Sequence, residues 1–154
     1  MIVRFKKESD GGGTLVFVRE DGSSTWMRAT RFFVQHDLMH YAVETAMGFR
    51  NAFLGLVAGG KDLADFEDNA KSWLPPEALV VETIVSQLMY ERAGSASPDE
   101  FHAAVDAACA GLGLPAQAIT PAQAAAARAR FDELLDQWRS TPSGEMMQLP
   151  WPAP

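Results

Sequence analysis

Cysteine is nearly absent from this sequence. Cys109 is the only cysteine in 154 residues, so no disulfide bond can form within the chain, and one chain cannot build a cysteine-rich zinc site. Such sparing use of cysteine fits a reducing compartment. We therefore expect an intracellular protein.

Excess positive charge is also lacking. The formal net charge is −7, whereas binding to a nucleic-acid backbone or an anionic membrane surface requires a basic face. No uncharged apolar run is long enough to span a membrane, because Glu44 and Arg50 interrupt the longest one, from Met39 to Ala58. No secretory signal is visible in residues 1–7. We expect a cytoplasmic protein that binds no nucleic acid and does not insert into a membrane.

The composition predicts a single globular domain over residues 1–154. Hydrophobic residues make up 47% of the chain and charged residues 21%, which is ordinary for a domain with a buried core.

The first 30 residues have the pattern of a three-stranded antiparallel β-meander. Residues favourable to β-structure occur at 2–7 and 14–20, and the glycines at 11–13 provide the turn between them. Asp21-Gly22 is a dipeptide typical of a second hairpin turn. A sheet this small must cover one face with helices.

Residues 31–140 have the patterns of helices. One long buried helix is predicted at about 31–58, apolar almost all the way round and ended by Gly59-Gly60. Three further helices are predicted at 77–92, 97–110 and 120–140, the last two opened by Ser-Pro-Asp-Glu and Thr-Pro-Ala-Gln capping signals, and a short acidic helix at 61–71. Residues 141–154 form a proline-rich tail whose segment 145–149 is a candidate edge strand. The predicted fold class is α+β, with a small N-terminal sheet packed on about four helices.

The long helix carries the only pattern in the sequence that indicates a specific chemistry. With about 100° of rotation per residue, His36, His40, Glu44 and Asn51 fall within less than a quarter turn of one another. Polar groups on a buried helix are costly unless they are paired or coordinate a metal. These polar residues on one side of the helix therefore predict a site for a divalent metal ion such as zinc, with His36 and His40 as ligands.

The segment His36-Asp37-Leu38-Met39-His40 resembles the His-Glu-x-x-His helix of zinc metallopeptidases. In that motif two histidines one turn apart bind zinc, and the acidic residue after the first histidine acts on the metal-bound water. The resemblance implies metal-dependent hydrolysis with Asp37 as the general base. Aspartate is shorter than the glutamate of the motif by about 1.5 Å.

The same segment is also similar to the zinc motif of a family of ubiquinone-biosynthesis proteins. In that family a glutamate follows after eleven intervening residues, and Ala52 stands at this position here.

The third ligand stays open in the sequence. Glu44 is one turn beyond His40 and is either a ligand or a carboxylate that holds the other ring nitrogen of His40. The second role is favoured, because the two turns between His36 and Glu44 correspond to about 12 Å of rise. The other candidates for the third ligand are Glu82, His102 and Asp106.

Two alternatives to a metal-dependent hydrolase remain. In the first, His36, His40 and Glu44 form a buried structural hydrogen-bond network in a non-catalytic binding or assembly module. In the second, apolar surface of the long helix that the chain itself leaves uncovered packs against another copy of the chain in a homodimer.

Overall fold

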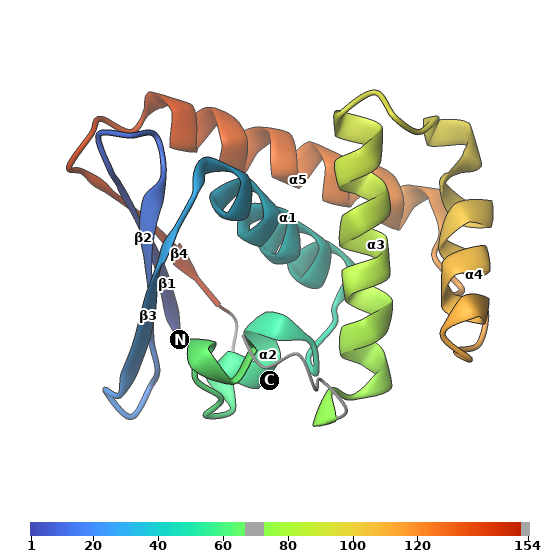
Figure 1. The fold of residues 1–154 in the computed structure, drawn as a ribbon, viewed down its shortest axis with the longest axis horizontal. Coiled ribbons are helices and arrows are strands. Elements are labelled where there is room, and N and C mark those ends of the chain that lie inside the picture. Colours follow the sequence, from blue (N-terminus) through green and yellow to red (C-terminus); the bar gives the residue numbers. More distant parts are fainter. Residues whose placement is uncertain (67–72, 152–154) are drawn as a thin grey trace.

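The computed structural model describes residues 1–66 and 73–151. Within them an antiparallel sheet of four strands packs against helices, so the fold class is α+β as predicted (Figure 1). The meander consists of β1 (Ile2–Lys7), β2 (Gly13–Val18) and β3 (Ser24–Ala29). The predicted edge strand in the tail is β4 (Met146–Pro150), which pairs with β1, so the order is β3-β2-β1-β4. Residues 152–154 of the predicted tail lie outside the described residues.

Alternation along the strands gives the sheet one buried face. Val3 and Phe5 of β1 pair with Phe17 and Leu15 of β2, and all four side chains are buried against the helices. The predicted turn at Asp21-Gly22 is observed in a three-residue variant: the N–H of Gly22 donates to the carbonyl of Arg19, and φ of Gly22 is +84°.

The helix predicted at 31–58 is two helices. Helix α1 covers Arg31–Met47, and the short helix α2 covers Phe53–Ala58 after a non-helical link. Gly48 ends α1 in the left-handed conformation (φ +77°), and its N–H donates to the carbonyl of Glu44. The prediction of one continuous helix was wrong because the pattern of apolar residues continues across the link, whereas the backbone turns at Gly48.

Close packing holds the link and α2 together. A Cβ atom built on Gly55 would lie 1.8 Å from the carbonyl oxygen of Arg50, so only glycine fits there. Glu77 accepts the backbone N–H groups of Arg50 and Asn51, which ties the link to the start of α3.

The remaining helices largely follow the predictions. Helix α3 covers Pro76–Arg92 and α5 covers Pro121–Ser140, where Thr120 and Gln123 form the expected capping box. The helix predicted at 97–110 begins with a 3₁₀ turn, η3 (Pro98–Glu100), and continues as α4 (Phe101–Gly111). Of the short helix predicted at 61–71, the structure has a 3₁₀ turn, η1 (Leu63–Phe66), and residues 67–71 lie outside the described part.

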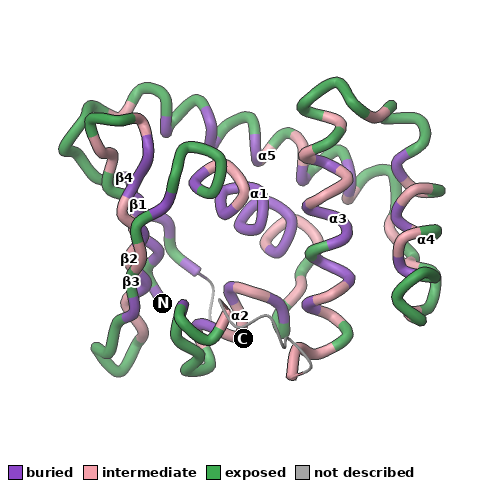
Figure 2. Tube along the Cα trace, viewed as in Figure 1, coloured by how far each residue is buried: buried purple, intermediate pink, exposed green. Residues whose placement is uncertain are grey.

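Helix α1 occupies the centre of the molecule. The sheet, α5, α3 and α2 surround it (Figure 1); its middle part is buried and its last residues are half-buried (Figure 2). Its first turn is different, because the side chains of Phe32 and Phe33 are 58% and 52% exposed. Since the rest of its apolar surface is covered within the chain, α1 does not itself require a second copy; the homodimer stays a prediction.

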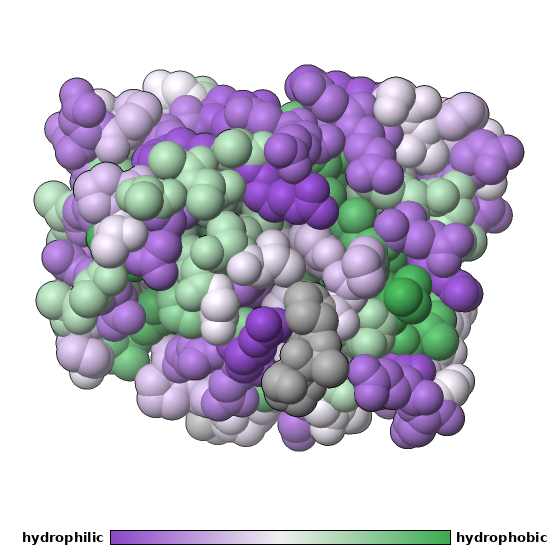
Figure 3. Space-filling view, turned by 180° about the vertical axis from the view of Figure 1, so that it is seen from behind, coloured by the Kyte–Doolittle hydropathy of each residue, from purple (hydrophilic) through white to green (hydrophobic). Residues whose placement is uncertain are grey.

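The outer surface is mixed. Seen from behind, hydrophilic and hydrophobic residues are interspersed over the surface (Figure 3). Among residues 1–66 and 73–151, no helix is both long and apolar enough to cross a membrane.

Candidate metal centre

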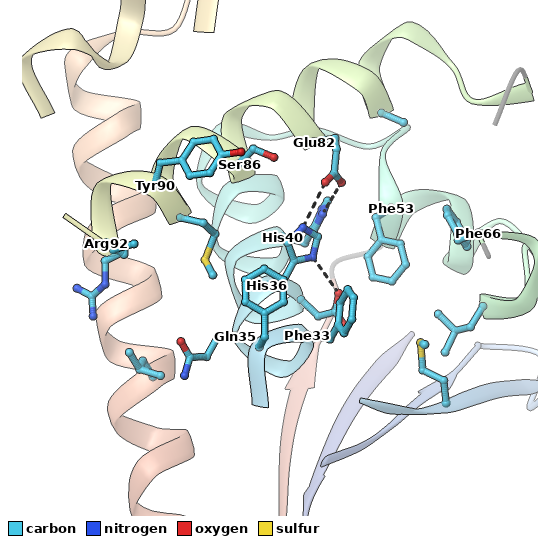
Figure 4. Close-up of a pocket in the computed structure, with 18 of the residues that line it drawn as sticks. Phe33, Gln35, His36, His40, Phe53, Phe66, Glu82, Ser86, Tyr90 and Arg92 are labelled. Carbon is cyan, nitrogen blue, oxygen red and sulfur yellow. Dashed lines mark hydrogen bonds and ion pairs between the residues drawn. The ribbon is translucent and has the colours of Figure 1, made fainter. Parts of the chain in front are cut away.

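Two neighbouring helices bring the candidate ligands together. Helix α1 carries His36 and His40 one turn apart, so both rings project from the same side. Helix α3 packs against α1 and contributes Glu82, whose carboxylate faces both rings (Figure 4). The group therefore joins residues that are more than 40 positions apart in the sequence.

The carboxylate of Glu82 bridges the two imidazoles. Its Oε1 atom lies 3.3 Å from Nε2 of His36, and its Oε2 atom lies 3.1 Å from Nε2 of His40. Two ligands of a tetrahedral zinc ion lie about 3.3 Å from each other, because each is about 2.0–2.1 Å from the ion. These three residues can each offer one ligand atom within 4.8 Å of the others, so the group can hold a metal ion once the side chains draw closer together.

Each histidine also has a carboxylate at its other ring nitrogen. Oδ1 of Asp37 lies 3.5 Å from Nδ1 of His36, and Oε1 of Glu44 lies 3.4 Å from Nδ1 of His40. A proton held at Nδ1 leaves the Nε2 lone pair available to a metal ion, and carboxylates commonly orient metal-binding histidines in this way.

Glu44 is the most deeply buried member of the cluster. Its side chain is fully buried, and its carboxylate accepts the backbone N–H of Leu54 at 3.0 and 3.2 Å. It therefore also provides a hydrogen-bond acceptor for the first turn of α2, where the N-cap residue Ala52 provides none. Glu44, which orients His40, thus also stabilises the turn between α1 and α2.

The carboxylates hold His40 in its charged form. Burial by itself lowers the pKa of His40, but hydrogen bonds and charge interactions with Glu44 and Glu82 outweigh it and raise that pKa to about 10. The pKa of His36 is also raised, because Asp37 and Glu82 outweigh its burial. Metal binding at these nitrogens must therefore displace protons.

The two glutamates respond to their surroundings in opposite directions. Burial raises the pKa of Glu44 above its usual value, although His40 and the N–H of Leu54 act against it. Burial also opposes ionisation of Glu82, but the hydrogen bonds from His36 and His40 dominate and lower its pKa. Since the side chain of Glu82 is 53% exposed, its carboxylate also remains accessible from solvent.

The cluster opens into a cavity of about 1240 Å³, which is larger than most small-ligand pockets. The lining comes from α1, α2, α3, α5, β3 and the η1 turn, and most of its residues are apolar or aromatic. Both histidines, Glu82 and Asp37 lie on its wall. A bound ion would therefore have one side open to a ligand.

The structure places the predicted site residues at different distances from this centre. His36 and His40 come together, with Glu82 as the third member, whereas Glu44 lies at the Nδ1 side of His40. Asp37 lies at the Nδ1 side of His36, away from the nitrogen that faces Glu82. These positions match an orienting role for both carboxylates.

The other two candidate ligands lie elsewhere. His102 and Asp106 are on α4, which packs on the side of α3 away from α1 (Figure 1). Oδ1 of Asp106 accepts the backbone N–H of Gln117, and Nε2 of His102 is buried without a hydrogen-bond partner in the described part of the chain.

The sequence carries a signal for Glu82 that favours it over the other candidates. Between Glu77 and Glu91, Glu82 is the only charged residue. A single carboxylate on a largely buried helix needs a partner, and the histidines of α1 provide it. Comparison of the chain with models of protein families, with curated proteins and with solved structures gave no match.

Proposed function

We propose that the protein binds a divalent metal ion through His36, His40 and Glu82 and acts as a metal-dependent hydrolase. Zinc is the best match, because two imidazoles and one carboxylate are a common ligand set of catalytic zinc. Asp37 and Glu44 hold the histidine rings in the orientation that metal binding requires.

The observation that carries the proposal is the arrangement of carboxylates around each ring. Both Nδ1 atoms face a carboxylate, at 3.5 Å for His36 and 3.4 Å for His40, while both Nε2 atoms face the shared carboxylate of Glu82. A purely structural pair of histidines needs no common direction for its Nε2 atoms. Their convergence on one carboxylate supports a shared ion.

Hydrolysis is supported by the coordination position that three protein ligands leave free. A zinc ion held by His36, His40 and Glu82 would leave a position free for water and would lower the pKa of that water to about 7. The half-exposed Glu82 and the adjoining cavity allow water and a substrate to reach this position.

The second candidate function is a non-catalytic binding or assembly module. It is supported by the same hydrogen bonds, because a charged His40 between Glu44 and Glu82 forms a paired network without any metal. In this case the cluster stabilises the contact between α1 and α3, and the cavity serves binding alone.

Metal analysis of protein purified without a histidine tag distinguishes the two. We expect one zinc ion per chain after dialysis against a limited excess of zinc, with strong loss of binding in His36→Ala and Glu82→Gln. His102→Ala is the matched control, because it removes the third histidine on the far side of α3 and should bind zinc like the parent protein. Equal zinc content in the parent and all three variants, or none in any of them, would exclude the metal centre.

Hydrolysis is tested with p-nitrophenyl esters of short and medium acyl chains. We expect turnover by the zinc-loaded protein that a chelator abolishes and that Glu82→Gln lacks. Rates that are the same with zinc and with chelator, for every ester, would argue against a hydrolase even if the metal binds.

A further inference from the structure

The two ends of the cavity differ in chemistry, with the metal centre between them. Figure 4 shows Phe53 and Phe66 on one side of His40 and Glu82, and Tyr90 and Arg92 on the other. A ligand that fills the cavity must match both ends and pass the metal centre. This arrangement allows the substrate class of the proposed hydrolase to be inferred.

One end is aromatic. The ring of Phe53 lies 5.2 Å from the ring of His40, and the ring of Phe66 follows 5.1 Å further on. Leu63 and Leu74 complete this end of the lining. It provides apolar contacts for an alkyl or aryl group immediately beside the metal centre.

The other end carries two arginine side chains, each paired with an aspartate. The side chains of Arg92 and Arg139 both line the cavity and are 43% and 64% exposed. Their ion-pair partners, Asp132 and Asp136, do not line it. Each guanidinium uses one nitrogen in its hydrogen bond with an aspartate, so further N–H donors remain for a carboxylate.

The spacing along α3 sets the length of the ligand. Ten residues separate Glu82 from Arg92, which corresponds to about 15 Å along the helix. The guanidinium of Arg92 lies over the ring of Phe131 and donates to Asp132, so it does not reach back along α3 toward Glu82. A carboxylate bound by Arg92 would then lie on the order of 15 Å from a carbonyl group beside Glu82, close to the reach of a ten- to twelve-carbon spacer.

We propose that the substrate is an anionic amphiphile, an ester or amide that joins an apolar acyl or aryl group to a chain ending in a carboxylate. The apolar group lies against Phe53 and Phe66, the carboxylate is bound by Arg92 and Arg139, and the carbonyl lies at the metal centre. Hydrolysis adds water across the C–O or C–N bond. The products are an apolar carboxylic acid and a hydroxy or amino acid, whose new O–H or N–H takes up the proton. This inference rests on the proposed hydrolase function for its reaction, but not for its binding mode.

The test uses metal-free protein and one probe with three head groups. The probe 12-(hexanoylamino)dodecanoate has an apolar chain, an internal amide and a terminal carboxylate; its methylamide is the neutral analogue, and N-(11-aminoundecyl)hexanamide is the cationic analogue. Calorimetric titration in the presence of a chelator should give at least a tenfold tighter binding of the carboxylate than of either analogue.

Two sets of variants assign the ends of the ligand. Replacing Arg92 and Arg139 together by Gln should remove the preference for the carboxylate and leave binding of the methylamide unchanged. Arg130→Gln is the matched control, because Arg130 forms a similar ion pair on α5 with Glu133 and does not line the cavity. Phe66→Ala should weaken all three probes by a similar factor, about tenfold.

The outcomes separate this inference from the proposed function. Equal binding of the three probes, tighter binding of the amine, or a carboxylate preference that survives in the double arginine variant would each overturn the substrate class, whether or not zinc binds. A carboxylate preference in the metal-free protein together with failure of zinc binding would support the inferred binding mode and reject the hydrolase. Circular dichroism establishes that each variant is folded.

Discussion

Zinc binding at pH 7 should release protons from the protein. The pKa of His40 is raised to about 10 by Glu44 and Glu82, so its ring is almost fully protonated at neutral pH. Zinc must replace the proton on Nε2. The raised pKa of His36 adds a further fraction of a proton. We therefore expect between one and two protons to be released per zinc ion bound.

The free-energy cost of removing this proton follows from the difference between the pKa of His40 and the pH of the experiment. A pKa of about 10 lies about three pH units above neutrality, so deprotonating His40 costs about 4 kcal/mol at pH 7. This cost falls as the pH rises, so zinc affinity should increase about tenfold per pH unit for each proton released. Between pH 6 and 8.5 the logarithm of the binding constant should have a slope between one and two.

Isothermal titration calorimetry measures this release directly. Titrations at pH 7 in buffers with different ionisation enthalpies give the number of protons from the dependence of the observed enthalpy on the buffer. The variant His102→Ala should release the same number as the parent protein. Zinc binding with no proton release and no dependence on pH would show that both imidazoles are neutral before binding, and would refute the reasoning from the carboxylate contacts.

Three further predictions concern the metal-free protein. His40 gains charge-stabilising partners on folding, so its contribution to the free energy of unfolding is complete below about pH 6.5 and is lost as the pH rises toward 10. Urea denaturation should show a loss of up to about 4–5 kcal/mol over this range. Equal stability at pH 7 and pH 10 would contradict this. Glu44→Gln should cost about 3 kcal/mol or more, because it removes the fully buried carboxylate that pairs with the charged His40 and accepts the N–H of Leu54, whereas the half-exposed Glu82→Gln should cost about 1 kcal/mol or less; similar losses would contradict the difference in burial. Gly55→Ala should cost about 3 kcal/mol or more, because its Cβ would lie 1.8 Å from a backbone oxygen, while Gly59→Ala, with its closest contact at 3.3 Å, should cost less than about 1 kcal/mol; thermal unfolding of both variants tests the packing of α2.

Local patterns were sufficient for much of the fold. Alternating residues and glycine turns predicted the meander, and the Thr120 capping signal predicted the start of α5. The edge strand followed from an apolar segment bounded by Pro150. These features depend on neighbours within a few residues, so a single sequence contains the information that decides them.

The end of α1 could not be read in the same way. The apolar residues from Met39 to Ala58 continue with a helical pattern, yet the chain turns at Gly48. The turn is held by Glu77 of α3, from outside the segment, and by Glu44 from within it. Since the sequence pattern does not show which distant groups will accept the freed N–H groups, it favoured one continuous helix.

The residues of the candidate centre show the same difference between local and tertiary information. The sequence by itself determined that His36 and His40 share one side of a helix with Asp37 and Glu44 nearby, because helical spacing depends on the local backbone alone. Only the tertiary structure decided that Glu82 faces both histidines, because that contact depends on how α3 packs against α1. The packing of two helices is set by the whole core, and it also decided which ring nitrogens converge and where the cavity lies.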